Sequence, residues 1–227
     1  MLNKLADSVF EVTSELKLGF GFILPIRSTV LVQSNGEVTI VSPIRFDEAI
    51  SAAIDALGPV TRILAPNKFH HLFLGKAAKR WPSARVHAAP GLAEKRKDLE
   101  IHEVLATGTG SLGPDLSWVE MEGSPAVREI VVVHKPSRTL VVTDLVFNVT
   151  EPRGFMTGII LRIMGTYGRL AQSRLVRLAT KDRAKAAASV RRLLELDFDR
   201  LLVAHGDVIE RGAKEKLTSA LSGMMKA

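Results

Sequence analysis

The chain of 227 residues contains no cysteine. This absence excludes a disulfide framework, a thiolate metal site and a cysteine nucleophile. A bound metal ion would therefore need His, Asp, Glu or Asn ligands. The lack of cysteine also fits a reducing compartment, and we expect the protein to be cytoplasmic.

Long hydrophobic runs are absent as well. The apolar stretches have the length of strands, and none approaches the roughly 20 residues that a membrane-spanning helix requires. The sequence therefore argues against an integral membrane protein. Residues 1–16 mix acidic and basic side chains without a continuous apolar run, so we expect no secretory signal peptide.

Aromatic residues make up only 5% of the chain, too few for the stacking platforms that bind nucleic-acid bases. The net charge is +7, and the basic residues are spread along the chain, with a modest concentration from Arg153 to Arg192. We interpret this charge as a solvated surface, with association to a membrane surface as the alternative. We do not expect nucleic acid as a partner.

What the chain does contain is typical of a globular protein, with 46% hydrophobic and 24% charged residues. Strand-like and helix-like patterns alternate along it. Strands are expected at residues 8–13, 28–33, 38–43, 60–65, 85–89, 116–121, 129–134, 139–144 and 199–204, and helices at 47–57, 72–80, 92–98, 181–196 and 212–224. This order predicts an α/β protein with layered sheets. Because no low-complexity linker divides the chain, we expect one domain, residues 1–227.

Polar residues of the metal-binding types follow three of the expected apolar strands. They are His70 and His71 after Ile63–Ala65, Asp144 after Leu140–Thr143, and His205 after Leu201–Ala204. Ligands in layered α/β folds collect at the carboxyl ends of strands. Imidazole and carboxylate groups suit zinc, iron or manganese, so the pattern indicates a metal site.

Four segments carry a resemblance that spans nearly the whole chain. They read Leu64-Ala-Pro-Asn-Lys-Phe-His-His, Gly123-Ser-Pro-Ala-Val-Arg-Glu, Leu140-Val-Val-Thr-Asp-Leu-Val-Phe and Val203-Ala-His-Gly-Asp. In order and spacing they resemble the metallo-β-lactamase superfamily, and more closely one uncharacterised branch of it. The resemblance implies a four-layer αββα sandwich and a metal-dependent hydrolase that acts through metal-activated water.

The resemblance also shows a degenerate motif. Active members read Thr-His-x-His-x-Asp-His in the first of these segments. The two histidines of His-x-His fall on Pro66 and Lys68 of this chain, and the histidine of the second segment falls on or near Ser124. An aspartate that active members often carry after an early strand falls near Ser42-Pro43. The half-site for a first metal ion is therefore expected to be lost.

The half-site for a second ion keeps its ligand types. On the resemblance, its ligands fall on His70, His71, Asp144 and His205, which would bind one zinc ion, or iron or manganese, or no ion at all. Four ligands would close a tetrahedral shell and make the ion structural, whereas three would leave a position open for water. The identity of any catalytic residue stays open at this point.

Two further residues are candidate accessories. Asn67 either shapes a turn after Pro66 or orients a ligand. Glu129 is a carboxylate on an apolar strand. It either substitutes for a ligand or, as we favour, is an edge-facing surface charge or forms a salt bridge to Arg138 across a hairpin. The remaining histidines, at positions 87, 102 and 134, are interpreted as structural or exposed.

The segment Phe155–Leu178 is the hardest to interpret, because glycines interrupt an amphipathic helical pattern. We expect a lid over the cleft or core packing, with a homodimer contact or a membrane-surface helix as alternatives.

Two functions remain open from the sequence. One is a metal-dependent hydrolase with a reduced, mononuclear site. The other is a catalytically inactive member of the fold that binds a small molecule or a partner in the same cleft.

Overall fold

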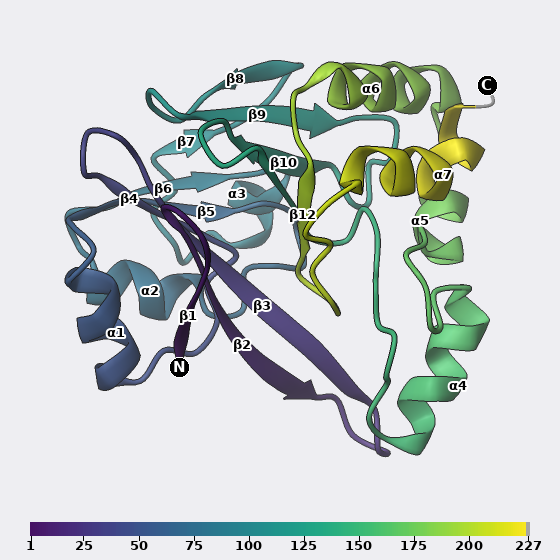
Figure 1. The fold of residues 1–227 in the computed structure, drawn as a ribbon, viewed down its shortest axis with the longest axis horizontal. Helices are drawn as coiled ribbons and strands as arrows, with labels where there is room; N and C mark the ends of the chain where they lie inside the picture. The colour runs from purple at the N-terminus through teal and green to yellow at the C-terminus, as the bar shows by residue number, and fades with distance from the viewer. Residues whose placement is uncertain (226–227) are drawn as a thin grey trace.

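The computed structural model describes residues 1–225, in which two β-sheets face each other (Figure 1). The larger sheet contains, in spatial order, β1 (Leu2–Ala6), β2 (Val9–Lys17), β3 (Ile23–Val32), β4 (Val38–Val41), β5 (Val60–Ala65), β6 (Arg85–Ala88) and β7 (Glu103–Val104). The smaller sheet contains β12 (Arg200–Val203), β11 (Thr139–Val142), β10 (Glu129–His134), β9 (Leu116–Met121) and β8 (Thr109–Ser111). The strands of the larger sheet therefore follow the chain in order.

Two pairs of the expected strands form hairpins. Strands β3 and β4 pair antiparallel around the turn at residues 33–37, and β10 and β11 pair antiparallel around residues 135–138. Strands β4, β5, β6 and β7 are parallel, as are β11 and β12. The strands that carry the candidate ligands are largely buried, which explains their continuous apolar sequences.

Helices cover the outer face of each sheet. The larger sheet is covered by α1 (Glu48–Asp55), α2 (Leu74–Arg80) and α3 (Leu92–Lys95), and the smaller sheet by α6 (Arg183–Glu195) and α7 (Ala213–Met225). Helices α4 (Phe155–Met164) and α5 (Arg174–Ala179) lie at one edge of the sandwich, below α7 in the view of Figure 1.

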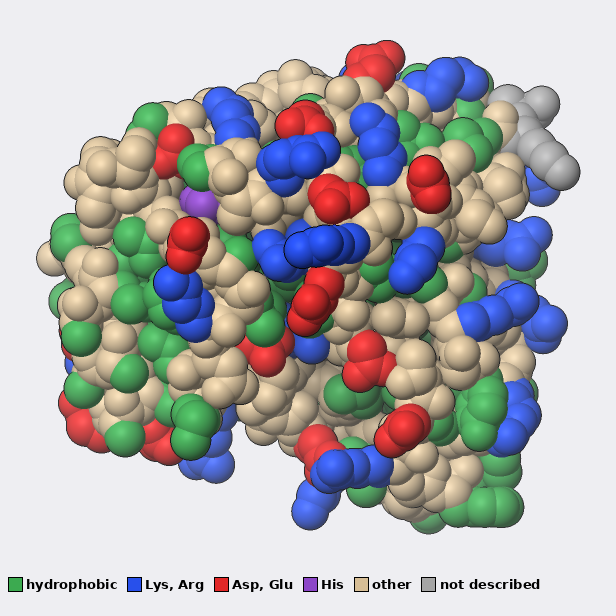
Figure 2. Space-filling view, viewed as in Figure 1, with side chains coloured by type: hydrophobic (Ala, Val, Ile, Leu, Met, Phe, Trp, Pro, Cys, Tyr) green, Lys and Arg blue, Asp and Glu red, His purple; other side chains and the backbone are tan. Residues whose placement is uncertain are grey.

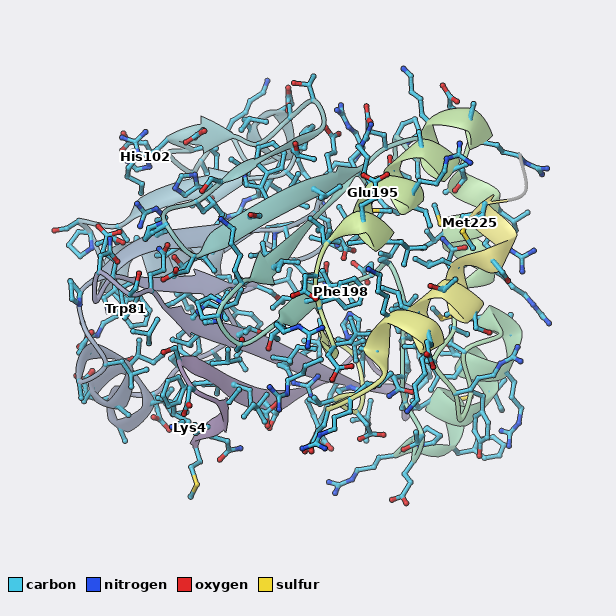
Figure 3. All side chains as sticks on the ribbon, turned by 45° about the horizontal axis from the view of Figure 1, so that its top comes forward. Lys4, Trp81, His102, Glu195, Phe198 and Met225 are labelled. Carbon is cyan, nitrogen blue, oxygen red and sulfur yellow. The ribbon has the colours of Figure 1, made fainter. Side chains whose placement is uncertain are left out.

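Three apolar clusters fill the spaces between these layers. One lies between the sheets and joins Leu31 and Leu64 of the larger sheet to Ile130 and Leu202 of the smaller. A second packs the larger sheet against its helices, and a third, which includes Phe198, packs the smaller sheet against α6 and α7 (Figure 3). The layers run helix, sheet, sheet, helix, so the predicted αββα sandwich is confirmed.

Local sequence signals set several helix ends. Asp47 accepts a hydrogen bond from the Ile50 amide at 2.7 Å, and Asp182 accepts one from the Lys185 amide at 3.0 Å, as N-caps of α1 and α6. Helix α4 ends at Gly165, whose φ of 78° is a left-handed conformation that glycine adopts without strain. The glycine-interrupted pattern of Phe155–Leu178 thus corresponds to two short helices rather than one.

No helix within residues 1–225 combines the length and the apolar character needed to cross a membrane.

Candidate metal centre

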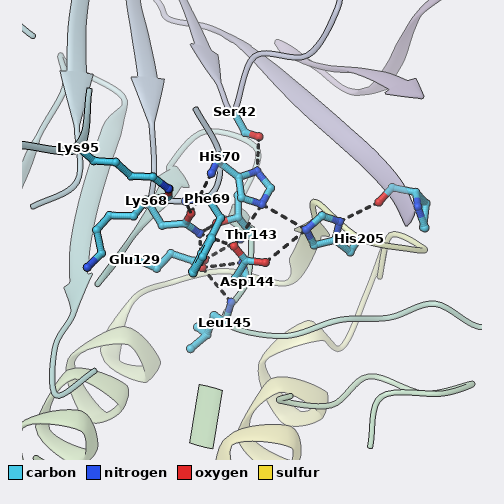
Figure 4. A network of polar contacts seen from close by, with 12 residues as sticks. Ser42, Lys68, Phe69, His70, Lys95, Glu129, Thr143, Asp144, Leu145 and His205 are labelled. Carbon is cyan, nitrogen blue, oxygen red and sulfur yellow. Dashed lines mark hydrogen bonds and ion pairs between the residues drawn. The ribbon is translucent and has the colours of Figure 1, made fainter. Parts of the chain in front are cut away.

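Three predicted ligands meet at the edge of the two sheets where β5, β11 and β12 end. His70 lies in the turns that follow β5, Asp144 follows β11, and His205 follows β12. Each offers one ligand atom to a common group in which these atoms lie within 4.8 Å of one another. In Figure 4 the two imidazole rings converge on the carboxylate. His70 and His205, 135 positions apart, are thus brought together by the packing of the two sheets.

The three side chains are spaced as metal ligands would be. The Nε2 atoms of His70 and His205 lie 3.2 Å apart. The Asp144 carboxylate lies 3.3 Å from Nε2 of His70 and 3.4 Å from Nε2 of His205, through different oxygens. In a tetrahedral shell with metal–ligand distances of roughly 2.0–2.1 Å, neighbouring ligand atoms lie about 3.3 Å apart. The two ring nitrogens have this spacing, and the carboxylate reaches each of them through a different oxygen, so the group is a candidate site for one small divalent cation.

Hydrogen bonds on the far side of each ring hold the two histidines. Nδ1 of His205 lies 2.8 Å from the carbonyl oxygen of Pro25, which can only accept, so Nδ1 carries the proton. Nε2 is then the ring nitrogen that faces Asp144. Nδ1 of His70 lies 2.6 Å from the Ser42 hydroxyl, which orients this ring in the same manner.

Asp144 is held and kept ionised by its surroundings. The side-chain amide of Asn67 donates a hydrogen bond of 2.7 Å to one carboxylate oxygen. Burial by itself would raise the pKa of Asp144, but the charges and hydrogen bonds of His70 and His205 outweigh it and hold that pKa well below its usual range. The site therefore combines a carboxylate anion with two imidazole nitrogens.

Asn67 has a double role that the sequence left open. Its amide oxygen accepts hydrogen bonds from the backbone amides of Phe69 and His70, at 2.7 and 3.0 Å, so it shapes the turn that carries the first ligand. Its amide nitrogen binds Asp144. One fully buried side chain thus fixes two of the three candidate ligands.

His71 does not join the group, contrary to the expectation of four ligands. Nδ1 of His71 lies 2.9 Å from a guanidinium nitrogen of Arg96. Because a guanidinium can only donate, Nδ1 of His71 is the acceptor, and Nε2 carries the proton of the neutral ring. Desolvation and the charges of Lys95 and Arg96 lower the pKa of His71 and keep the ring neutral. Neighbouring residues on a turn point apart, and only His70 faces Asp144.

Glu129 is neither a surface charge nor a partner of Arg138, so the favoured interpretation is wrong. The side chain is buried, and its carboxylate accepts hydrogen bonds of 2.6–2.9 Å from the backbone amides of residues 143, 144 and 145. Burial and the nearby Asp144 charge raise its pKa to about 7. Glu129 therefore holds the turn that carries Asp144. Arg138 pairs with Asp197 instead.

Side chains at the positions of the expected first half-site make other contacts. The Lys68 ammonium donates to the carbonyl oxygen of Pro125, and the Ser124 hydroxyl donates to that of Ala179 at 3.3 Å. In Figure 4 the Lys68 side chain extends away from the two histidines. Pro66 has no ligand atom in its side chain.

A cleft of about 350 Å³ opens beside the candidate ligands. His70, Asp144 and His205 line its floor together with His71 and Ser42. Most of the other lining residues are apolar, namely Leu16, Leu18, Leu24, Ile26, Pro43, Ile44, Phe69, Leu72 and Phe73. The polar groups are thus few and convergent in an apolar cleft, as in many small-molecule sites.

A buried ion pair behind the site was missed by the sequence analysis. The Arg27 guanidinium lies 2.6 Å from the Glu11 carboxylate across β2 and β3, and it also donates to the carbonyl oxygen of Val203. This contact ties the larger sheet to β12 two residues before His205. In the sequence, Glu11 and Arg27 cannot be told from charged residues at solvent-facing strand positions, so no local signal could have identified the pair.

The other histidines are structural or exposed, as expected. His134 is buried and lies 2.7 Å from the Ser137 hydroxyl. His102 is exposed, and its Nδ1 accepts from the Val86 amide. His87 is buried between the sheets, where desolvation lowers its pKa to about 4.

Comparison with known proteins identifies the fold of the chain. No protein-family model matches the chain, and no curated protein matches it in sequence. Solved metallo-β-lactamase structures do resemble it closely in shape. One from Erythrobacter litoralis is 18% identical, with a TM-score of 0.68 over 98% of this chain and 96% of that one.

Two further structures give the same result. A metallo-β-lactamase from Pontibacter korlensis is 15% identical, with a TM-score of 0.67 over 100% of this chain and 99% of that one. One from Pseudomonas aeruginosa, solved in a mono-zinc form, is 13% identical, with a TM-score of 0.65 over 100% and 96% of the two chains. The chain has the fold of the metallo-β-lactamase superfamily.

Proposed function

We propose that this protein is a metal-dependent hydrolase with a single ion held by His70, Asp144 and His205. The observation that carries the proposal is the spacing of 3.2–3.4 Å between the three ligand groups. Two ring nitrogens and a carboxylate this close together need a cation or a proton between them to offset their mutual repulsion. The hydrogen bonds from the far sides of the rings support the same assignment.

Two imidazoles and one carboxylate suit a catalytic more than a structural ion, because three protein ligands leave a coordination position open. A divalent ion in such a set acts as a Lewis acid and makes water nucleophilic at neutral pH. The protein's own groups would do the rest. Asn67 keeps Asp144 oriented, and the neutral His71 supplies an N–H donor at the cleft.

The apolar walls of the cleft also matter for the reaction. Leu18, Phe69 and Leu72 are each more than half exposed, at 51%, 55% and 59%, although they line the cleft. They offer binding surface to an apolar part of a substrate and would exclude water around it. We therefore expect a substrate whose scissile bond is flanked by a hydrophobic group.

The second candidate is a catalytically inactive binding protein with the same cleft. The replacement of the first half-site by Pro66 and Lys68 supports it, because the active motif uses those positions for metal ligands. This alternative differs in its prediction. It expects ligand binding, with or without a metal ion, and no turnover.

The two candidates are separated by hydrolysis assays with metal-stripped and reconstituted protein. Aryl esters of short and long acyl chains, a lactone, an anilide and a phosphodiester would be tested with zinc, manganese and iron(II). The hydrolase proposal expects turnover that is lost on chelation and restored by one of the metals, with long acyl chains preferred over short ones.

Asp144→Asn and Glu94→Gln form a matched pair for the same assay. Each removes one carboxylate, but Glu94 is exposed and has no ion pair among residues 1–225. Asp144→Asn should reduce turnover at least 100-fold, by the usual order of effect for an essential charged group, and Glu94→Gln should leave it unchanged. No metal-dependent turnover on any substrate, with stoichiometric metal bound, would favour the binding protein.

A further inference from the structure

The positive charge of this protein is concentrated in one segment. Residues 152–181 contain six basic and no acidic side chains, whereas the remainder of the chain is close to neutral. The basic residues are Arg153, Arg162, Arg169, Arg174, Arg177 and Lys181. The segment therefore accounts for +6 of the net charge of +7. It comprises α4, α5 and the loops around them.

Five of these six cations form no ion pair within the described residues 1–225, and only Arg153 contacts a carboxylate, that of Glu15 at 3.2 Å. Three of the others lie against neutral groups. Arg174 donates to the carbonyl oxygen of Ile163 at 3.2 Å, Arg169 to that of Gly165 at 3.4 Å, and the Arg162 guanidinium stacks on Tyr167 at 3.7 Å. The positive charges are thus exposed and uncompensated.

The same segment exposes large apolar side chains. Phe155 and Leu178 are each 82% exposed, Ile163 is 67% exposed, and Leu175 is 62% exposed. Helix α5 has three large apolar residues and buries none of its side chains. Figure 2 shows basic and hydrophobic side chains together along the edge that α4 and α5 occupy. We call these exposed residues of α4, α5 and their loops the basic–apolar face.

The tip of the β2–β3 hairpin extends this face. The amide of Ile23 binds the Thr157 hydroxyl of α4 at 2.8 Å, and a side chain added at Gly154 would meet the carbonyl oxygen of Gly21. The hairpin tip therefore lies against the start of α4. Phe20 at this tip is 98% exposed and adds another large apolar side chain to the face.

We propose that the basic–apolar face docks on an anionic lipid membrane. Exposed Leu, Ile and Phe side chains would enter the boundary between headgroups and acyl chains, while the arginines would bind the lipid phosphates. Charge complementarity selects this partner. A two-fold dimer through the same face would set six positive charges against six others. Nucleic acid would satisfy the charges but would leave the aliphatic side chains in water.

Vesicle co-sedimentation tests the proposal with the intact protein. Vesicles of phosphatidylcholine alone would be compared with vesicles that also contain phosphatidylglycerol, at low salt and at about 0.5 M salt. We expect binding to the anionic vesicles only, and weaker binding at high salt. A triple variant, Arg169→Gln, Arg174→Gln and Arg177→Gln, should bind about 100-fold more weakly, since each basic residue near an anionic surface contributes roughly fivefold.

Two further variants make the result specific. Leu175→Ser with Leu178→Ser keeps every charge and should also weaken binding, because both side chains are exposed and their loss does not disturb the core. The matched control removes three charges elsewhere, by Lys76→Gln, Lys79→Gln and Arg85→Gln on an exposed part of the opposite sheet layer. This control should bind like the unchanged protein.

Several outcomes would overturn the proposal. They are no binding to anionic vesicles at low salt, or an equal loss of binding in the control variant. A dimer in sedimentation velocity that dissociates in the Leu175→Ser, Leu178→Ser variant would assign the face to a second copy instead. Tighter binding to a DNA duplex than to anionic vesicles would assign it to nucleic acid. None of these results depends on whether the metal centre is catalytic.

Discussion

Each candidate ligand ring forms a hydrogen bond through Nδ1 to a neutral oxygen on the side away from Asp144. The Ser42 hydroxyl lies 2.6 Å from Nδ1 of His70 and positions this ring. Ser42→Ala should lower metal affinity by about 10–100-fold, as is usual when such a partner is removed. Competition against a chromogenic chelator measures it. Ser83→Ala, at an exposed serine, is the control, and equal affinities in the two variants would contradict the assignment.

Glu129 should act on stability through the turn that it holds. In Glu129→Gln, an amide group would face backbone amides that now donate to a carboxylate, and at least one buried donor would lose its acceptor. We expect the free energy of unfolding to fall by about 2–3 kcal/mol, measured by urea denaturation. Glu94→Gln should be neutral. A stability equal to that of the unchanged protein would show that Glu129 does not anchor the turn.

The lowered pKa of His87 predicts that the protein becomes less stable as the pH falls below 6.5. Its pKa is about 4 in the folded protein and 6.5 in the unfolded chain, so between these values only the unfolded chain binds the proton. Its contribution is intact above pH 6.5, and stability falls by up to about 3 kcal/mol as the pH drops toward 4. His87→Leu should flatten this part of the curve of unfolding free energy against pH. An unchanged slope would contradict the prediction.

At the level of single residues, the sequence predicted which residue types could be ligands better than it predicted which of them come together in the site. His70, Asp144 and His205 follow buried strands; the parallel pair β11 and β12 brings Asp144 and His205 together, and the packing of the two sheets brings in His70 after β5. His71 could not be separated from its neighbour, because the guanidinium that engages its Nδ1 comes from residue 96. Glu129 was misjudged because burial, rather than residue type, decides what a carboxylate does.

Among the elements, the ion pair of Arg27 and Glu11 joins β2, β3 and the end of β12. Arg27→Met would leave the Glu11 carboxylate buried without its partner and should cost about 3–5 kcal/mol of stability. The double variant with Glu11→Leu should recover most of this loss, because no isolated charge remains. Thermal and urea unfolding would measure both. A double variant as unstable as the single one would contradict the explanation.

The elements themselves were largely predictable. Hairpins with short polar turns and helices with aspartate caps, such as α1 and α6, have strong local signals. Helix α2 begins at Leu74, two residues later than the pattern suggested, because residues before it form the turn that Asn67 shapes. The division of Phe155–Leu178 into two helices depends on Gly165, whose effect on chain direction a helical pattern does not reveal.

At the scale of the whole molecule, the order of strands and helices predicted layered sheets, and the resemblance to the superfamily implied their four-layer arrangement. The αββα sandwich follows from apolar faces that must be covered on both sides of two sheets. The concentration of charge on one edge was underestimated from the sequence, because exposure and the absence of paired acids become visible only in the folded chain. The expected loss of the first half-site, by contrast, rests on the resemblance and on residue identity at positions 66, 68 and 124.

The most direct test of the central claim is the metal content of the protein purified without a metal-affinity tag. Elemental analysis, before and after reconstitution with zinc, manganese or iron(II), should find about one ion per chain, held by the three ligands. His205→Ala should lose that ion, whereas His71→Ala should retain it. Metal far below one equivalent after reconstitution, or an unchanged content in His205→Ala, would contradict a metal centre at His70, Asp144 and His205.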